Sequence, residues 1–145
     1  GRLKYFISGG APLNADIGRF FMALGVNLLQ GYGQTEASPL ISANRPHLIK
    51  IDTVGPPVDG VELRILEDGE ILVRGDMLMK GYWRDPATTA GVIKNGWLYT
   101  GDLGSVDEDG YITITGRKKD LIMNCNQNTL YGEIIVNDKY EEYAA

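Results

Sequence analysis

The sequence predicts an α/β plus β protein, in which the end of a parallel α/β subdomain precedes a small antiparallel β-barrel or sandwich. A strand, helix, strand pattern in the first thirty residues predicts the parallel part. Short alternating apolar and polar runs from about residue 61 predict the antiparallel part. The character of the chain changes again after residue 116. We therefore expect three segments: residues 1–52, 53–116 and 117–145.

The first segment contains the elements of a βαβ unit. Residues 3–7 are rich in β-formers and end at a Gly-Gly pair, which predicts a strand. Asn14 is a suitable helix cap, and Gly25 ends the helix. Apolar side chains recur at helical spacing between them: Ile17, Phe20, Phe21 and Leu24. Residues 26–29 form the next expected strand, so a right-handed parallel crossover is predicted.

The second segment is expected to be mostly antiparallel strands. Residues 61–65 and 70–74 alternate around an Asp-Gly turn, which predicts a hairpin. Asp85 is expected to cap a short helix that has Pro86 at its first position. Two further strands are expected at residues 97–100 and 111–115.

Composition excludes several classes of protein. The formal net charge of -5 argues against a nucleic-acid binder, because a phosphate backbone requires a basic face. The single cysteine, Cys125, excludes an internal disulfide, and the single histidine, His47, makes a zinc site untenable. No apolar stretch approaches the ~20 residues of a membrane span. We expect a cytoplasmic protein, with peripheral membrane association of the parent protein left open.

Four glycine-marked motifs occur in one order: residues 8–13, 31–36, 99–103 and 116–120. The first two follow the two expected parallel strands, and ligands gather beyond the carboxyl ends of such strands, so we expect them to form one site. Within residues 31–36, Thr35 supplies a hydroxyl and Glu36 a carboxylate. This pair suits phosphate oxygens and a hard cation such as Mg²⁺. The alternative for this motif is a polar turn after a buried strand.

With all four motifs, the chain resembles the adenylate-forming superfamily, which includes acyl-CoA synthetases, luciferase and the adenylation domains of peptide synthetases. It looks most similar to the long-chain fatty acid–CoA ligases, over about residues 3–123. The resemblance implies that residues 1–52 end a large N-terminal domain and that residues 117–145 hold a hinge and the start of a small mobile C-terminal domain. From residue 124 the chain departs from the family pattern.

The resemblance also implies roles for individual residues. Thr35 would donate to an α-phosphate or carboxylate oxygen, and Glu36 would hold Mg²⁺. Tyr32 would stack on adenine. Asp102 would accept hydrogen bonds from the ribose hydroxyls, and Arg117 would reach ribose or phosphate.

The remaining positions of the expected site are backbone, packing and hinge residues. Close approach of the backbone to nucleotide and acyl chain would occur at Gly9, Gly10, Ala11, Gly31 and Gly33. Ile114 would pack on the nucleoside, and Lys119 matches the hinge. Structural alternatives stay open: a turn aspartate for Asp102, an exposed ion pair for Arg117, plain core for Ile114 and an exposed lysine for Lys119.

The implied protein is a fragment of an ATP-dependent acyl-CoA synthetase. It would use a carboxylic acid, expected to be a fatty acid, together with ATP, Mg²⁺ and coenzyme A as cosubstrate. Two alternatives are an adenylation domain that loads a carrier protein and a non-catalytic nucleotide-binding module. The family's phosphate-binding loop and late catalytic lysine are expected in the missing N- and C-terminal parts of the enzyme, so the isolated chain is expected to be inactive. Acyl chain length and oligomeric state are not determined by the sequence.

Overall fold

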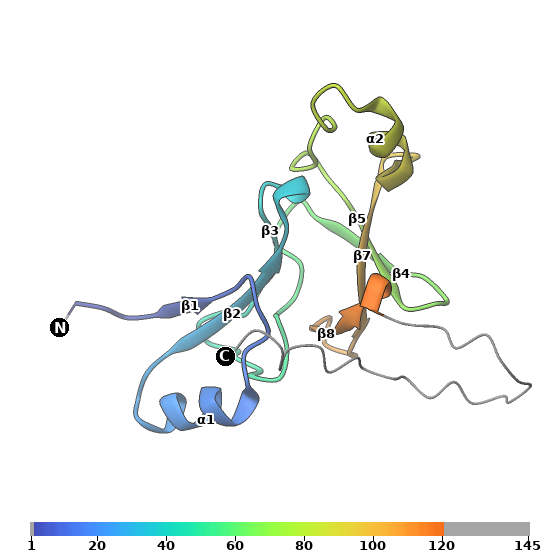
Figure 1. The fold of residues 1–145 in the computed structure, drawn as a ribbon. Helices are drawn as coiled ribbons and strands as arrows, with labels where there is room; N and C mark the ends of the chain where they lie inside the picture. The colour runs from blue at the N-terminus through green and yellow to red at the C-terminus, as the bar shows by residue number, and fades with distance from the viewer. Residues whose placement is uncertain (1, 121–145) are drawn as a thin grey trace, which may run out of the picture.

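The computed structural model describes residues 2–120, which form two β-sheets and two α-helices (Figure 1). The first sheet has the order β1-β2-β3, with bounds Phe6–Ser8, Leu28–Gly33 and Leu40–Ala43. Strands β1 and β2 are parallel, and β3 is antiparallel to β2. The predicted parallel strand, helix, strand unit is therefore confirmed. The strand β3 was not predicted from the sequence.

Helix α1 (Ala15–Ala23) begins and ends where its sequence signals predict. The Asn14 side chain accepts hydrogen bonds from the backbone N–H groups of Asp16 and Ile17, at 2.9 and 3.2 Å. Gly25, just beyond the helix, has a φ of 81°, which a residue without Cβ adopts readily.

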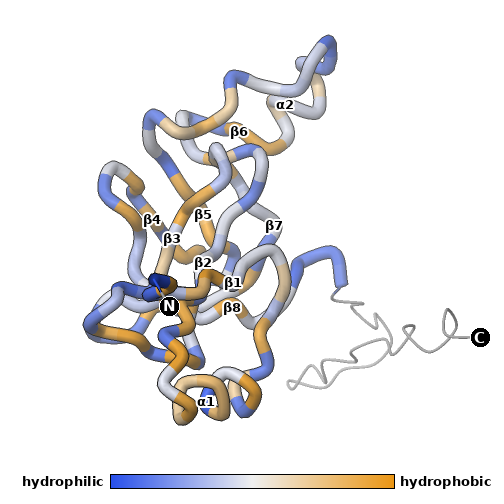
Figure 2. Tube along the Cα trace, turned by 90° about the vertical axis from the view of Figure 1, so that its left-hand side faces the viewer, coloured by the Kyte–Doolittle hydropathy of each residue, from blue (hydrophilic) through white to orange (hydrophobic). Residues whose placement is uncertain are grey.

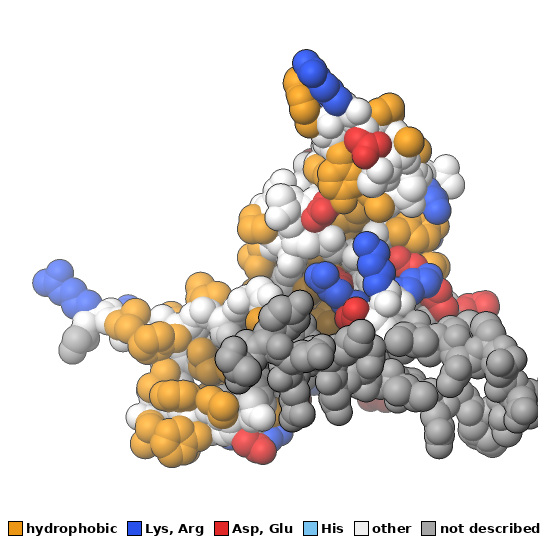
Figure 3. Space-filling model, viewed as in Figure 1, with side chains coloured by type: hydrophobic (Ala, Val, Ile, Leu, Met, Phe, Trp, Pro, Cys, Tyr) orange, Lys and Arg blue, Asp and Glu red, His pale blue; other side chains and the backbone are white. Residues whose placement is uncertain are grey.

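The large apolar side chains of α1 and of its C-cap residue are exposed. They are 43% to 65% exposed, and hydrophobic side chains gather over the helix in Figure 3: Ile17, Phe20, Phe21 and Leu24. The buried residue of the helix is Gly18, where an added Cβ would lie 2.7 Å from Ile51 Cγ1, and Arg19 beside it pairs with Asp52. Its helical spacing therefore predicted the helix but not the buried face.

The second sheet is antiparallel and open. Its order is β4-β5-β7-β6, with β8 paired to β7. The bounds are Glu62–Ile65 for β4, Glu70–Arg74 for β5, Ile93–Lys94 for β6, Trp97–Val106 for β7 and Ile112–Arg117 for β8. The β4–β5 hairpin is as predicted, and Gly69 in its turn has a φ of 84°. No closed barrel forms within residues 2–120, so that form of the prediction is wrong.

Helix α2 (Pro86–Val92) also follows its sequence signals. The Asp85 carboxylate accepts a hydrogen bond from the Thr88 N–H at 2.9 Å, and Pro86 occupies the first turn. The helix lies at the far end of the molecule from α1 (Figure 1). Neither helix in the described part of the chain is long and apolar enough to cross a membrane.

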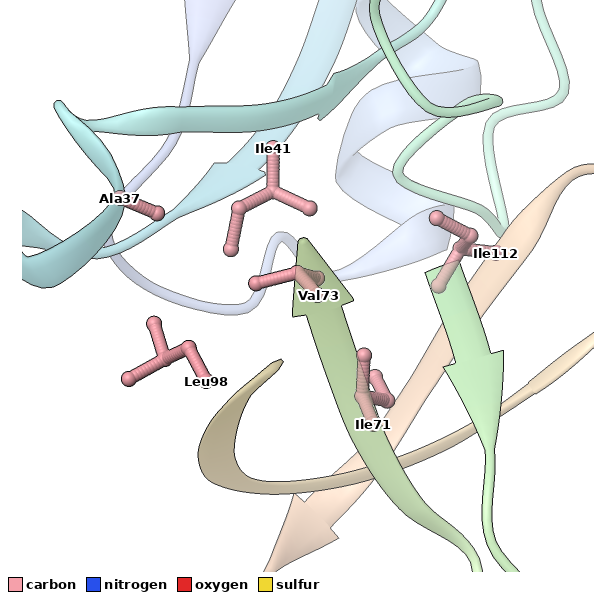
Figure 4. Close-up of a cluster of buried hydrophobic side chains, with 6 residues drawn as sticks. All are labelled: Ala37, Ile41, Ile71, Val73, Leu98 and Ile112. Atoms are coloured by element: carbon pink, nitrogen blue, oxygen red, sulfur yellow. The ribbon is translucent and has the colours of Figure 1, made fainter. Parts of the chain in front are cut away.

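The core lies between the two sheets (Figure 4). Its fully buried side chains come from the 3-10 helix η1 (Thr35–Ala37) and from β3, β5, β7 and β8: Ala37, Ile41, Ile71, Val73, Leu98 and Ile112. The strand β5 contributes most, and Figure 2 shows its hydrophobic residues as a continuous stretch. One core thus joins the two expected subdomains, although the boundary at residue 52 stays a prediction.

Residues 54–56 connect the two sheets, because their backbone forms hydrogen bonds with a strand of each sheet. On one side the Val54 N–H donates to the Ile112 carbonyl at 2.8 Å, and the Ile112 N–H donates to Gly55 at 3.0 Å. On the other side the Ala43 N–H donates to Pro56 at 3.2 Å. The glycine-marked motifs of both sheets are therefore held within one packed unit.

Candidate functional site

The motif at residues 31–36 is a strand end followed by a helical turn. Gly31 and Gly33 belong to β2, and Thr35–Ala37 form the 3-10 helix η1. Neither glycine has a positive φ. An added Cβ on Gly33 would lie 1.6 Å from the Pro39 carbonyl oxygen, so the return of the chain into β3 already requires a glycine here.

The two N-terminal glycine motifs lie side by side, as predicted. Ser8 pairs with Gln30 in the parallel register, and an added Cβ on Gly9 would lie 3.2 Å from the Gly31 carbonyl oxygen. Gly10 has a φ of 83° and open space around it, and Ala11 is exposed. The backbone at the carboxyl ends of β1 and β2 is thus accessible to a ligand at this edge.

Asp102 occupies the centre of the site. It is 4% exposed and lies inside β7, which continues past the expected strand end at residue 100. The Tyr32 hydroxyl donates to Oδ2 at 2.7 Å, and Arg117 Nε lies 3.0 Å from Oδ1. Asp102 is therefore not a turn aspartate, because its carboxylate joins three motifs that are far apart in the sequence.

The carboxylate of Asp102 retains acceptor capacity after its contacts with Tyr32 and Arg117. Each carboxylate oxygen has two lone pairs and accepts one of these two contacts, so acceptor capacity remains. The Arg117 side chain is 68% exposed, so much of the guanidinium faces solvent. Arg117 therefore forms an exposed ion pair, which was the structural alternative to a ligand-binding role. Its guanidinium is also accessible to a ribose or phosphate.

Tyr32 is held between the core and Asp102. Its ring packs against the hydrophobic cluster, while its hydroxyl reaches the carboxylate. Burial first, and then the hydrogen bond to Asp102, raise the pKa of the Tyr32 phenol well above its ordinary value. The phenol therefore stays a hydrogen-bond donor at every physiological pH.

Glu36 lies at the exposed edge of the site. The Tyr82 hydroxyl donates to its Oε1 at 2.8 Å, and the Met79 N–H donates to its backbone carbonyl at 2.8 Å. The hydrogen bond to Glu36 raises the pKa of Tyr82. Thr35 is exposed beside it. Neither Tyr82 nor Met79 was expected in the site, because no local pattern links them to a residue more than forty positions away.

The residues around Glu36 fit a magnesium ion that is bound together with a nucleotide. Within residues 2–120, no cluster of three or more His, Cys, Asp or Glu residues could hold a metal alone. Magnesium commonly uses one or two protein carboxylates and takes its other ligands from phosphates and water. In the described chain, Glu36 Oε2 accepts no hydrogen bond and is free to bind a cation. The neighbouring Gln34 Nε2 is buried without a partner, and as an N–H donor it suits a phosphate oxygen and not the metal.

The remaining expected residues lie on β8 and just beyond it. Ile114 packs against the core, so its core alternative holds, and its contact with a nucleoside stays a prediction. Lys119 is exposed in the 3-10 helix Lys118–Asp120. The preceding Lys118 was missed: its Nζ lies 2.8 Å from Oε2 of the buried Glu70 and 2.6 Å from Asp68. The expected C-terminal domain, from residue 121, lies outside the described residues.

A protein-family model described as "AMP-binding enzyme" matches residues 1–83. The chain belongs to this family. Among relatives of the AMP-binding enzyme family, it is 48% identical over 123 residues to a long-chain-fatty-acid–CoA ligase of Mycobacterium bovis, covering 85% of this chain and 20% of the relative. It is 37% identical over 150 residues to a feruloyl-CoA synthase of an Amycolatopsis species, covering 95% of this chain and 30% of that protein.

Solved structures of AMP-binding enzymes have the same fold. ATP-bound MatB from Rhodopseudomonas palustris matches with a TM-score of 0.77 and 39% identity, over 82% of this chain and 26% of that one. The anthranilate CoA ligase AuaEII in complex with anthranoyl-AMP matches with a TM-score of 0.76 and 30% identity, over 83% of this chain and 25% of that one. The chain thus spans about a fifth to a third of the length of these proteins.

Proposed function

We propose that this chain is the nucleotide-binding part of an acyl-CoA ligase that activates a long-chain fatty acid with ATP and passes the acyl group to coenzyme A. The observation that carries the proposal is that Tyr32 and Arg117, from two separate motifs, both contact the buried carboxylate of Asp102, which belongs to a third motif. A buried acid with spare acceptor capacity beside an exposed guanidinium suits a ribose and its neighbouring phosphate. The relatives named above support the acyl-CoA ligase class.

The reaction has two steps. A carboxylate oxygen of the acid attacks the α-phosphorus of ATP, and the bond from that phosphorus to pyrophosphate breaks. The coenzyme A sulfur then attacks the acyl carbonyl and loses its proton, and AMP leaves with the electrons of the carbon–oxygen bond. Both steps depend mainly on positioning and on stabilising charge at the phosphate.

The residues of this chain would share that work. Asp102 would hold the ribose hydroxyls, and Arg117 would bind ribose or phosphate with the exposed part of its guanidinium. Thr35 would donate its hydroxyl to a phosphate or carboxylate oxygen. Glu36 would hold magnesium, which supplies charge neutralisation at the phosphates when it is bound.

The backbone at Gly9, Gly10, Ala11 and Gly31 would line the nucleotide and acyl side of the site. Tyr32 would offer a ring edge or face to adenine, and Ile114 would contact the nucleoside from β8. Lys119 would act as the hinge between the described residues and a mobile domain. These assignments rest on the family resemblance. Gly9, Gly10, Ala11 and Lys119 are exposed, whereas Gly31, Tyr32 and Ile114 are partly buried.

ATP–pyrophosphate exchange by the full-length protein tests the proposal. A panel of acids from acetate to palmitate is compared with and without an Asp102→Ala substitution. Exchange that depends on long-chain acids and collapses in the variant is the expected result. Exchange without release of AMP by coenzyme A would favour carrier-protein loading, and no exchange with any acid would favour a non-catalytic module. The isolated 145-residue chain is expected to give no exchange.

A further inference from the structure

Two residues of the segment 79–82 donate hydrogen bonds to Glu36. The Met79 N–H donates to the Glu36 backbone carbonyl at 2.8 Å, and the Tyr82 hydroxyl donates to Glu36 Oε1 at 2.8 Å. The first contact fixes the position of the main chain, and the second fixes the orientation of the carboxylate. In Figure 1 the short helix η1, which carries Glu36, lies next to the chain that leads to α2.

Tyr82 is itself anchored from the helix side. Its backbone N–H donates to Thr89 Oγ1 at 2.9 Å, and that hydroxyl donates to the Asp85 carbonyl at 2.8 Å. At Gly81, an added Cβ would lie 2.8 Å from Thr89 Cγ2, so the chain passes Thr89 with no space for a side chain. The first turn of α2 therefore holds the backbone from which the phenol reaches Glu36.

The geometry divides the work of the carboxylate between its two oxygens. Oε1 accepts the phenol, and Oε2 accepts no hydrogen bond from the described residues. A hydrogen bond to a charged acceptor is stronger than a neutral one, and it reduces the number of orientations that the side chain samples. Partners of this kind, one step removed from a metal, orient the ligand and tune its affinity.

We propose that Tyr82 is a positioning residue, which holds the Glu36 carboxylate in the orientation that binds the magnesium ion of the nucleotide complex. This inference rests on the proposed function, because it takes Glu36 as a magnesium ligand. Tyr82 touches neither nucleotide nor acid and acts only through Glu36. The first turn of α2 then links the antiparallel sheet to the metal-binding edge of the first sheet.

Binding of Mn²⁺ to the full-length protein with a nonhydrolysable ATP analogue, followed by electron paramagnetic resonance, gives a readout that is independent of turnover. Tyr82→Phe is expected to raise the Mn²⁺ dissociation constant about tenfold. The matched control is Tyr111→Phe, which removes a phenol hydrogen bond of the same 2.8 Å length, to the Leu48 carbonyl. The control is expected to leave the constant within about twofold of wild type.

A double-mutant cycle with Glu36→Gln distinguishes positioning of the Glu36 carboxylate by Tyr82 from a general effect of Tyr82→Phe on the structure. If Tyr82 acts through Glu36, adding Tyr82→Phe to Glu36→Gln changes the Mn²⁺ constant by less than about twofold further. An equal loss in both backgrounds would overturn the positioning role, as would an unchanged constant in Tyr82→Phe alone.

The same variants distinguish failure of this inference from failure of the proposed function. If Glu36→Gln leaves Mn²⁺ binding unchanged, Glu36 is not a metal ligand, and the positioning role falls with that assignment. If Mn²⁺ binding follows the expected pattern but no acid supports pyrophosphate exchange, the positioning role stands and the proposed reaction is wrong.

Discussion

The two carboxylates of the site each accept a hydrogen bond from a tyrosine, but they lie in opposite surroundings. Asp102 lies inside β7, is 4% exposed, and pairs with Tyr32 and Arg117. Glu36 lies in a short 3-10 helix at the edge and pairs with Tyr82, which is 36% exposed. The same chemical pair therefore contributes to the fold at Asp102 and leaves an oxygen for a ligand at Glu36.

The largest expected effect on stability comes from Asp102→Ala. The substitution leaves the partly buried Tyr32 hydroxyl without its acceptor and removes the ion pair with the exposed Arg117, so we expect the free energy of unfolding of the full-length protein to fall by about 2 kcal/mol. Denaturant unfolding measures it. The control is Asp109→Ala, whose exposed pairing with Lys50 is screened by solvent and contributes little. Equal effects of the two substitutions would contradict a structural role for Asp102.

A second buried carboxylate provides an intermediate case. Glu70 is 5% exposed and accepts from the Gly101 N–H at 3.2 Å, while its partner Lys118 is half exposed. We expect Glu70→Gln to cost about half as much as Asp102→Ala, because the neutral amide oxygen still accepts from Gly101 while the ion pair is lost. Denaturant unfolding of both variants under the same conditions checks the ratio. A larger loss for Glu70→Gln would place the stronger anchor at the end of β8 instead of at the site.

The sequence predicted local structure well wherever the signal was local. Asn14 and Asp85 cap their helices, and the Asp68-Gly69 turn closes its hairpin, because each depends on neighbours within a few residues. The outward face of α1 was not predictable, since helical spacing identifies an apolar side without telling what covers it.

The candidate site was predicted as a set of motifs but not as a set of contacts. The neighbouring positions of Gly9 and Gly31 followed from the parallel strand order. The pairing of Tyr32 with Asp102 spans 70 positions, and that of Glu36 with Tyr82 spans 46. Such pairs are set by packing of the two sheets, and a single sequence carries no local signal for them.

The third prediction tests the burial of the Tyr32–Asp102 pair by titration. Burial and the carboxylate raise the folded-state pKa of Tyr32 above the unfolded value of about 10. The unfolded chain therefore loses this proton first as pH rises, so the stabilisation is complete below pH 10 and declines above it. Denaturation midpoints between pH 8 and 11 are expected to fall more steeply for wild type than for Tyr32→Phe. Parallel curves would mean that Tyr32 ionises freely and that its pair with Asp102 is open to solvent.

The smallest expected effect on stability comes from Glu36→Gln, and it is the most informative about the difference between the two carboxylates. Glu36 is only partly buried, and the amide oxygen of Gln still accepts from Tyr82. We expect the free energy of unfolding to change by less than about 0.5 kcal/mol, as for other substitutions away from the core. If nucleotide-dependent Mn²⁺ binding is lost at the same time, the carboxylate at this edge serves the ligand and not the fold. A loss of stability close to that of Asp102→Ala would instead mean that both tyrosine–carboxylate pairs hold the sheets together, and the contrast between them would disappear.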